Sequence, residues 1–582
     1  MQADAKSGQQ NVQPGRKLAP DDAAALVGRL RAIVGSAHVR VGSRETAPYA
    51  TGYRYGAGPA AAVVMPGTLV EQWRVVRECV FADAIVIMQG ANTGLTGGST
   101  PDGVYDRPVV TINAMRIAGI HILGGGAQVV CLPGARLDDL ERKLKPLGRE
   151  PHSVIGSSCI GASVLGGICN NSGGALVRRG PAYTELALFA RLDSQGKLHL
   201  VNHLGINLGD HENTILHRLE VGDFTEADVD RSGDRAASDR CYVDRIRQVD
   251  DATPARFNAD PTRLFEASGC AGKVVLFAVR LDTFPAELGT VTFYIGTNKP
   301  LELTALRRRI LTQFDELPVS AEYLHRDAFD IAESYGKDMF LAIRLLGTRR
   351  IPALLSLKSR VDRVMRRLPR LFHFATDRVL HALARLFPAH LPVRVKGFRE
   401  RFEHHLLLKV SADGAEAARS HLSAIFASAS GEFFECTATE AEKAFLHRFV
   451  IAGAAVRYRA IHPRQVADIV ALDVALPRNA KDWFEVLPAD LSRWTIKSLY
   501  YGHFLCHVFH QDYIVAKGHC PTALEEKVLS RLDARGAEYP AEHNVGHMYH
   551  AKPHLAAHYR SLDPCNVFNP GIGRTPRRAH WR

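Results

Sequence analysis

The chain has 582 residues and a formal net charge of +12 at pH 7, with 46% hydrophobic and 23% charged residues. This composition excludes a wholly disordered, collagen-like or coiled-coil protein, and the length predicts two or three folding units. Residues 1–24 contain no apolar stretch like those of secretion signals or anchors, so we expect a polar N-terminal tail.

Cysteine usage and the lengths of the apolar runs bear on where the protein works. The ten cysteines are scattered singly and form no C-x-x-C pair, which favours a reducing cytoplasm over a disulfide framework. No run reaches the ~18 consecutive apolar residues that a membrane-spanning helix needs. We therefore expect a cytoplasmic protein without a spanning helix.

From Ala60 to about Phe284, short apolar runs alternate with helical patterns. The alternation predicts a region of mixed helices and strands. The predicted strands are residues 62–65, 85–88, 109–112 and 128–131, and the predicted helices are residues 69–81 and 137–147.

Three glycine-rich turns interrupt this region, at residues 89–100, 155–174 and 268–273. Glycine allows positive φ angles, so successive backbone N–H groups can converge on an anion such as a diphosphate. There is neither a Walker sequence nor a G-x-G-x-x-G turn, so the standard nucleotide cradles are absent. Each turn taken alone is equally compatible with a structural loop.

The order and spacing of the three turns resemble the FAD-binding domain of the vanillyl-alcohol oxidase and p-cresol methylhydroxylase superfamily. The resemblance implies a two-lobed domain in which the turns contact, in chain order, the pyrophosphate, the flavin with its ribityl chain, and the adenine end. The residues implied to bind FAD are Gly90, Ala91, Asn92, Thr93, Gly94, Gly98, Ser99, Gly156, Ser163, Gly166, Gly167, Gly173, Gly272 and Leu276. Some members tether the flavin through a histidine. The turns here contain none, apart from the nearby His152, so we expect non-covalent FAD.

Positive charge is concentrated between residues 341 and 400, where fourteen lysines and arginines face three acidic residues. Apolar residues from Leu354 to Leu368 recur at spacings of three and four. Four arginines recur in the same way on another face, namely Arg360, Arg363, Arg367 and Arg370. A basic amphipathic helix of this kind is typical of proteins that bind anionic lipid surfaces.

An alternative for the same segment is the solvated face of ordinary helices. No helix-turn-helix, zinc finger or aromatic-studded sheet motif accompanies the charge, so we expect no nucleic-acid partner. A basic lipid- or nucleic-acid-binding protein without catalysis is the alternative of a different class, and the glycine turns argue against it.

Chemistry-bearing residues gather in the last third of the chain. Oxidation of a 2-hydroxy acid needs a base for the hydroxyl proton, a cation for the carboxylate, and the carbon that loses hydride held against the flavin. The strand-like run from Tyr501 to Asp512 carries His503 and His510, and Glu542-His543 follows. Each histidine could equally be an ordinary core or surface residue.

The spacing of these residues resembles the G-H-(six residues)-H and E-H signatures of FAD-dependent D-2-hydroxy-acid dehydrogenases. The resemblance implies that His503, His510 and Glu542 ligate a divalent metal, a donor set that suits zinc or manganese. It further implies that His543, or a neighbouring histidine, is the base and that Arg448 binds the substrate carboxylate. Residues 505–508 depart from the Gly-Asp-Gly-Asn usual between the two histidines.

Residues 26–582 are similar to the respiratory, quinone-dependent D-lactate dehydrogenase family. The resemblance implies an α+β fold whose parts are a two-lobed FAD-binding domain of the p-cresol methylhydroxylase type, a discontinuous α+β cap and a basic, mainly helical membrane-binding segment. The expected bounds are 25–284 for the FAD-binding domain, 285–330 and 403–535 for the cap, 331–402 for the membrane-binding segment, and 536–582 for a C-terminal segment that returns to the FAD-binding domain.

The implied reaction is oxidation of D-lactate to pyruvate by hydride transfer to flavin N5, with electrons passed to a membrane quinone. The implied location is the cytoplasmic face of the inner membrane, where the protein would be peripheral. The alternative is the same chemistry on another D-2-hydroxy acid, such as 2-hydroxyglutarate.

Overall fold

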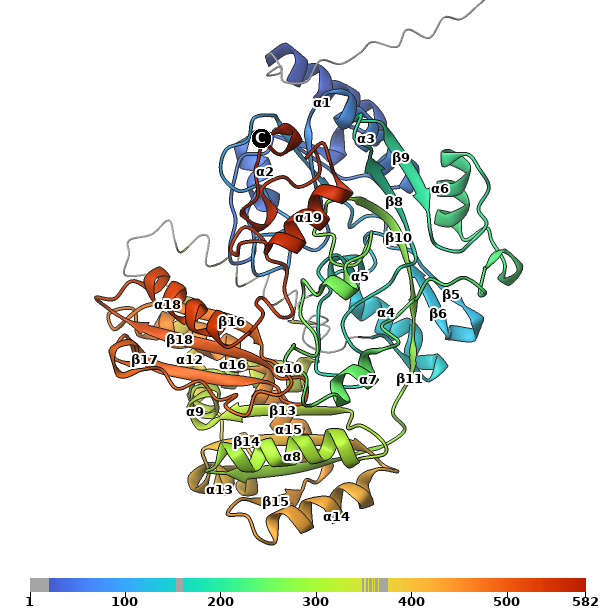
Figure 1. Ribbon diagram of the computed structural model, residues 1–582. Coiled ribbons are helices and arrows are strands. Elements are labelled where there is room, and N and C mark those ends of the chain that lie inside the picture. The colour runs from blue at the N-terminus through green and yellow to red at the C-terminus, as the bar shows by residue number, and fades with distance from the viewer. Residues whose placement is uncertain are drawn as a thin grey trace, which may run out of the picture.

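The computed structural model describes residues 20–152, 161–347 and 375–582, together with residues 350, 351, 354, 358, 361 and 365. Gly156 lies outside the described residues, as do the four arginines of the predicted basic helix, Arg360, Arg363, Arg367 and Arg370. Two lobes occupy one end of the molecule and a broad sheet domain occupies the other (Figure 1).

The first lobe is built on a four-stranded sheet in the order β1-β2-β4-β3. Strands β2, β4 and β3 run parallel, and β1 pairs antiparallel with β2. Every residue of β2 and β4 is buried, because helices and loops cover both faces of the sheet. The bounds are α1 Pro20–Val34, β1 Val39–Val41, α2 Ser43–Ala50, β2 Ala62–Val64, α3 Leu69–Phe81, β3 Ile85–Gln89 and β4 Val109–Asn113. The strands and the helix predicted here are confirmed to within one residue.

The second lobe contains a five-stranded antiparallel sheet in the order β5-β6-β10-β8-β9. Its bounds are β5 Ile120–Leu123, β6 Gln128–Cys131, α4 Leu137–Leu144, α5 Val164–Cys169, β8 Ala187–Leu192, β9 Leu198–Asn202, α6 Glu212–Val221, α7 Tyr242–Arg247 and β10 Val275–Asp282. The helix predicted over residues 137–147 is confirmed, and its last turn tightens to a 3₁₀ turn at Lys145–Leu147.

The third part is a seven-stranded antiparallel sheet in the order β15-β12-β14-β13-β17-β18-β16. Successive side chains of a strand point to opposite faces. Helices α8, α14 and α18 pack on one face, and α9, α15 and α16 pack on the other. The bounds are β12 Thr290–Thr297, α8 Pro300–Gln313, β13 Ser320–His325, α9 Arg326–Tyr335, β14 His404–Ser411, α14 Ala415–Phe426, β15 Glu432–Glu435, α15 Ala438–Phe449, α16 Ile451–Ile461, β16 Val466–Ala475, β17 Thr495–His503, β18 Val508–Ala516 and α18 Pro521–Ala534. The predicted α+β class is confirmed.

The run from Tyr501 to Asp512, which the sequence suggested was a single strand, is a hairpin. β17 ends at His503, β18 begins at Val508, and the turn between them contains His507 in a left-handed conformation with φ 55°. Tyr501 faces His510 across the pair. The turn thus places the two predicted metal-binding histidines on neighbouring strands.

Helices α10 (Lys337–Leu346), α12 (Ala375–Arg385) and α13 (Val393–Arg401) flank the partly described basic segment. This region carries a concentration of exposed apolar side chains. They are Leu345, Leu346, Leu354, Val379, Leu380, Leu383, Leu386, Phe387 and Val393. None of the described helices combines the length and the apolar character needed to cross a bilayer.

The C-terminal segment, which contains α19 (Pro553–Leu562), returns to the first lobe (Figure 1). The backbone N–H of Asn569 donates to the carbonyl of Val86 at 2.9 Å, and Phe568 bridges Val86 in parallel. The buried Lys273 Nζ donates to Asn566 Oδ1 at 2.8 Å. Both ends of the chain therefore contribute to one body.

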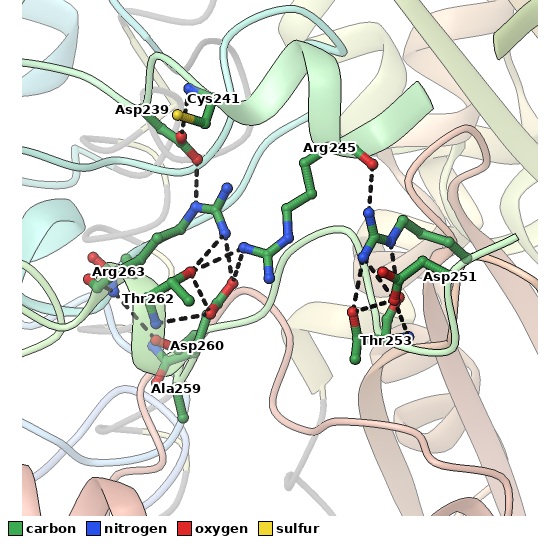
Figure 2. A network of polar contacts seen from close by, with 12 residues as sticks. Asp239, Cys241, Arg245, Asp251, Thr253, Ala259, Asp260, Thr262 and Arg263 are labelled. Atoms are coloured by element: carbon green, nitrogen blue, oxygen red, sulfur yellow. Dashed lines mark hydrogen bonds and ion pairs between the residues drawn. The ribbon is translucent and has the colours of Figure 1, made fainter. Parts of the chain in front are cut away.

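A buried polar network supports the loop between α7 and the third glycine turn. Asp260 accepts from Arg245 Nη1 at 2.7 Å and from Arg263 Nη1 at 2.5 Å, and Arg263 also pairs with Asp239 (Figure 2). From the sheet domain, Arg478 donates to the backbone carbonyls of Arg245 at 2.6 Å and Thr253 at 3.0 Å. The network fixes this loop of the second lobe against the sheet domain.

We expect Arg478→Met to lower the free energy of unfolding by about 3 kcal/mol, because it leaves buried carbonyl groups without a donor. The control is Arg308→Met at the same boundary. Its ion pair with Asp250 is partly exposed, with 35% and 82% of the two side chains accessible, and should contribute less than about 1 kcal/mol. Chemical denaturation followed by tryptophan fluorescence measures both, and equal effects would contradict the role of the buried network.

Candidate active site

The first glycine turn presents unpaired backbone donors. None of the N–H groups from Ala91 to Leu95 donates a hydrogen bond to another described residue. Side chains hold the turn open: Asn92, at φ 53°, donates to the carbonyl of Thr51 at 3.0 Å and accepts from Ser99 Oγ at 3.1 Å. A run of free N–H groups in a fixed turn is a suitable cradle for a diphosphate.

The second turn lies directly against the first. A Cβ added at Gly90 would collide with Ser163 Oγ, so only glycine permits this approach. Ser163 caps α5 by accepting from the N–H of Gly166 at 3.3 Å. Gly167, in the same helix, faces Ala182 at ordinary contact distance.

Asparagine side chains tie the turns to the C-terminal segment. Asn569 Nδ2 lies 2.8 Å from both the Gly98 carbonyl of the first turn and the Ala271 carbonyl of the third. Asn544 Nδ2 donates to Asn170 Oδ1 of the second turn at 2.8 Å. The three turns predicted to contact one ligand are therefore adjacent in space.

The remaining predicted cofactor residues occupy two environments. Gly272 has φ +80° and approaches Asn569, as the third turn requires. Leu276 is buried in β10, where its carbonyl accepts from Gln72 Nε2 at 2.9 Å. The cradle fits a dinucleotide cofactor, because the unpaired N–H donors of the first turn lie where the three turns meet, and Gly90 and Gly98 leave no room for a Cβ.

His503, His510 and Glu542, the metal ligands that the family resemblance implies, lie together and form the triad. Glu542 Oε2 lies 3.2 Å from His503 Nε2 and 3.8 Å from His510 Nε2. One ligand atom from each residue lies within 4.8 Å of the others, a spacing that a metal ion could bridge. Two neighbouring strands and the C-terminal segment thus supply the donors.

Arg256 orients the carboxylate of this triad. Its Nη2 donates to Glu542 Oε1 at 2.5 Å and to the Gly174 carbonyl of the second turn at 2.7 Å. A Cβ at Gly173 would collide with the same carboxylate. Arg256 thereby occupies one oxygen of Glu542 and leaves the other facing the histidines.

Alternating charges stabilise the cluster. Burial alone would lower the pKa of His503, but the carboxylates of Glu322 and Glu542 outweigh it and raise that pKa to about 10. Burial lowers the pKa of His510 to about 4. Burial would raise the pKa of Glu542, but His503 and Arg256 hold it well below its usual range.

His543 forms a dyad with Asp473. Asp473 Oδ2 accepts from His543 Nδ1 at 2.7 Å and from the Glu542 backbone N–H at 2.7 Å. Burial opposes protonation of His543, but Asp473 outweighs it and raises the pKa of His543. The carboxylate fixes the ring so that Nε2 is the nitrogen directed away from Asp473.

Arg448 lies on α15 above the same sheet face. Its Nη2 pairs with Glu322 Oε2 at 2.9 Å, and its guanidinium lies 4.7 Å from the Tyr501 ring centroid. Its Nε has no hydrogen-bond partner among the described residues. Arg448 therefore retains a free donor beside the triad.

Sequence reasoning missed Glu322, Asp473 and Arg256. A signal existed for two of them, since Glu322 and Asp473 are charged residues within apolar strand runs, where burial is costly without a partner. Arg256 lies in an irregular loop, and no pattern in the sequence marks it.

We expect Gly173→Ala to lower the free energy of unfolding by about 1–3 kcal/mol, because the added methyl must displace the carboxylate of Glu542. Gly453→Ala, at an open position in α16, should instead stabilise by up to about 1 kcal/mol. Thermal and chemical unfolding measure both variants. A neutral Gly173→Ala variant would show that Glu542 is not held where the structure has it.

Comparisons with known proteins agree with this geometry. Residues 60–199 match the model of an FAD binding domain, and residues 292–581 match the model described as D-lactate dehydrogenase, membrane binding. Quinone-dependent D-lactate dehydrogenases of Haemophilus influenzae and Escherichia coli are each 55% identical to the chain over 96% of its length. The matches cover 99% of the Haemophilus influenzae protein and 98% of the Escherichia coli protein. That of Corynebacterium glutamicum is 44% identical over 98% of this chain and 100% of its own length.

Solved structures with little sequence identity share the fold. 4-Ethylphenol oxidase from Gulosibacter chungangensis has a TM-score of 0.57 at 12% identity, covering 96% of this chain and 98% of its own. p-Cresol methylhydroxylase has a TM-score of 0.58 at 11% identity, covering 96% of this chain and 97% of its own. The predicted two-lobed architecture of the p-cresol methylhydroxylase type is confirmed.

Proposed function

The chain belongs to the family of quinone-dependent D-lactate dehydrogenases, and we propose that it oxidises D-lactate to pyruvate with FAD and passes the electrons to a membrane quinone. The observation that carries the proposal is the contact between the second glycine turn and the triad. Arg256 and Gly173 join the surface suited to the flavin directly to Glu542. A substrate held at the triad therefore borders the cofactor.

The side chains suit the roles that the reaction requires. His543, oriented by Asp473, is the base that takes the proton of the C2 hydroxyl, and Arg448 donates to the substrate carboxylate through groups left free by Glu322. FAD supplies the hydride acceptor when it is bound. The glycine turns hold no histidine that could tether it, and the nearby His152 is buried, so we propose that the cofactor is bound non-covalently.

Substrate choice distinguishes this proposal from its alternative, a dehydrogenase of D-2-hydroxyglutarate. We expect kcat/KM with a soluble dye as acceptor to be at least 100-fold higher for D-lactate than for D-2-hydroxyglutarate, and activity with L-lactate to be negligible. Steady-state kinetics of the purified holoenzyme measures all three. A preference for D-2-hydroxyglutarate would replace the substrate and keep the reaction class.

A divalent metal, zinc or manganese, is proposed at His503, His510 and Glu542. Two imidazole nitrogens and one carboxylate oxygen form a donor set that suits both ions. A metal bound there would lower the pKa of the substrate hydroxyl. Arg256 and Glu322 would act as its supporting shell, each holding one ligand in place.

We expect Glu542→Gln to reduce zinc and manganese affinity at least tenfold, because it removes the anionic ligand. The control is His404→Gln, since His404 is buried in the same sheet but bonds Tyr323 on the opposite face. Metal content after equilibrium dialysis against a graded zinc or manganese buffer is the measurement. Equal metal content in the wild type and Glu542→Gln would remove the metal from the proposal.

Membrane association is proposed to combine the exposed apolar side chains of α10 and α12 with the basic segment, on a lipid surface that carries anionic headgroups. The segment has fourteen basic residues and three acidic ones, and this excess of positive charge is attracted to anionic headgroups. Contact of this kind is peripheral, and we propose the cytoplasmic face of the inner membrane, because anionic lipids there attract basic segments.

We expect Arg360→Gln, Arg363→Gln, Arg367→Gln and Arg370→Gln together to lower partitioning onto phosphatidylglycerol-containing vesicles at least tenfold, since each cation near the surface contributes about 1 kcal/mol. Turnover with a soluble dye should not change. Co-sedimentation with the vesicles measures binding, and vesicles of pure phosphatidylcholine are the reference. Undiminished binding of the quadruple variant to the anionic vesicles would contradict the electrostatic part of the proposal.

A further inference from the structure

Three buried histidines outside the triad lack the partners that buried polar groups normally have. They are His390, His405 and His447, with 6%, 0% and 1% of their surfaces exposed. Both ring nitrogens of His405 and Nε2 of His390 have no hydrogen-bond partner among the described residues, and His447 has only the nearby backbone of Phe329. Such groups are rare in folded proteins, and each calls for an explanation.

The three rings belong to one aromatic layer between the sheet and helices α9, α10 and α15. The His447 ring centroid lies 4.2 Å from that of Phe329 and 6.2 Å from that of His390, which in turn lies 4.5 Å from Phe340. His405 is 5.7 Å from Phe329. Burial lowers the pKa of His405 and His447 to about 3 and of His390 to about 4, so all three rings are neutral.

This layer connects the lipid-facing region with the triad. His390 follows Leu386 and Phe387 in the chain, whose side chains are 80% and 50% exposed. His447 precedes Arg448, which pairs with Glu322. Glu322 in turn accepts from His503 Nδ1 at 2.6 Å. The layer therefore lies close in the chain to exposed apolar residues, through His390, and to Arg448 of the proposed substrate site, through His447.

A metal does not account for the unpaired nitrogens. Among the described residues, only His503, His510 and Glu542 are gathered as metal ligands would be. A ligand that carries hydrogen-bonding oxygens on a flat apolar ring matches the layer better. Neutral imidazole offers one donor and one acceptor nitrogen, and phenylalanine rings offer stacking surfaces.

We propose that His390, His405 and His447 form the binding site for the quinone head group. This inference rests on the proposed function. Imidazole N–H groups donate hydrogen bonds to the two carbonyl oxygens of the quinone. The unprotonated ring nitrogens accept hydrogen bonds from the two hydroxyl groups of the quinol. Because the three side chains are buried and packed against phenylalanine rings, the head group can bind only if the ring contacts beside Phe340 part.

The proposed step balances. D-lactate loses two electrons and two hydrogens, one as the C2 hydride and one as the hydroxyl proton, and becomes pyruvate. The quinone gains two electrons and two protons, and its two C=O groups become C–OH. FAD, when bound, would carry the two electrons, and the two protons that the quinone takes up equal those that D-lactate gives up.

The test separates the quinone from the dye reaction in the holoenzyme. We expect His447→Leu and His390→Leu to raise KM for decylubiquinone at least tenfold, with D-lactate:dye turnover within twofold of wild type. His447→Gln keeps a hydrogen-bond donor and an acceptor, so its KM for decylubiquinone should lie between those of the wild type and His447→Leu. The matched control His404→Leu removes a buried histidine from the opposite face of the sheet and should leave KM for decylubiquinone unchanged.

An unchanged KM for decylubiquinone in folded His447→Leu and His390→Leu variants would overturn the proposal. Loss of D-lactate oxidation with both acceptors in the wild type would instead refute the proposed function. If the variants do not fold, photolabelling of the wild type with an azidoquinone decides. Label on peptides containing Phe340 or His390 supports the site, and label only elsewhere overturns it.

Discussion

One carboxylate joins the two halves of this protein. Glu542 gives one oxygen to Arg256 of the second lobe and the other to His503 of the large sheet. Because the group is buried, it requires positive partners on both sides, and these hold its pKa well below the usual range. The second glycine turn is packed against the same carboxylate, so the surface suited to the flavin and the surface suited to the substrate share a boundary.

The rest of the site follows from satisfying buried charge around that carboxylate. His503 lies between Glu322 and Glu542, Arg448 compensates Glu322, and Asp473 fixes both His543 and the backbone of Glu542. On the same face of the sheet, an apolar layer contains His390, His405 and His447, and ring nitrogens of all three lack hydrogen-bond partners among the described residues. The face thus combines a charged cluster with apolar packing that encloses unpaired imidazoles.

Much of this was predictable where a local pattern reports on a local cause. The buried strands of the first lobe, helix α3 and the three glycine turns follow from apolar runs and backbone freedom. The triad required resemblance to a family, because its members come from β17, β18 and the C-terminal segment. The hairpin was missed since residues 504–507 carry no glycine, and the turn relies on His507 in a left-handed conformation. Arg256 was missed because only tertiary packing brings an irregular loop to Glu542.

The most direct test of the account is the visible spectrum of the purified protein before and after anaerobic addition of D-lactate, with L-lactate as the reference. The account predicts a bound flavin that is released by denaturation alone and is bleached by D-lactate but not by L-lactate. A flavin that D-lactate leaves unchanged would contradict the proposed substrate site at the triad, and a colourless protein that takes up no FAD would contradict the cofactor cradle itself.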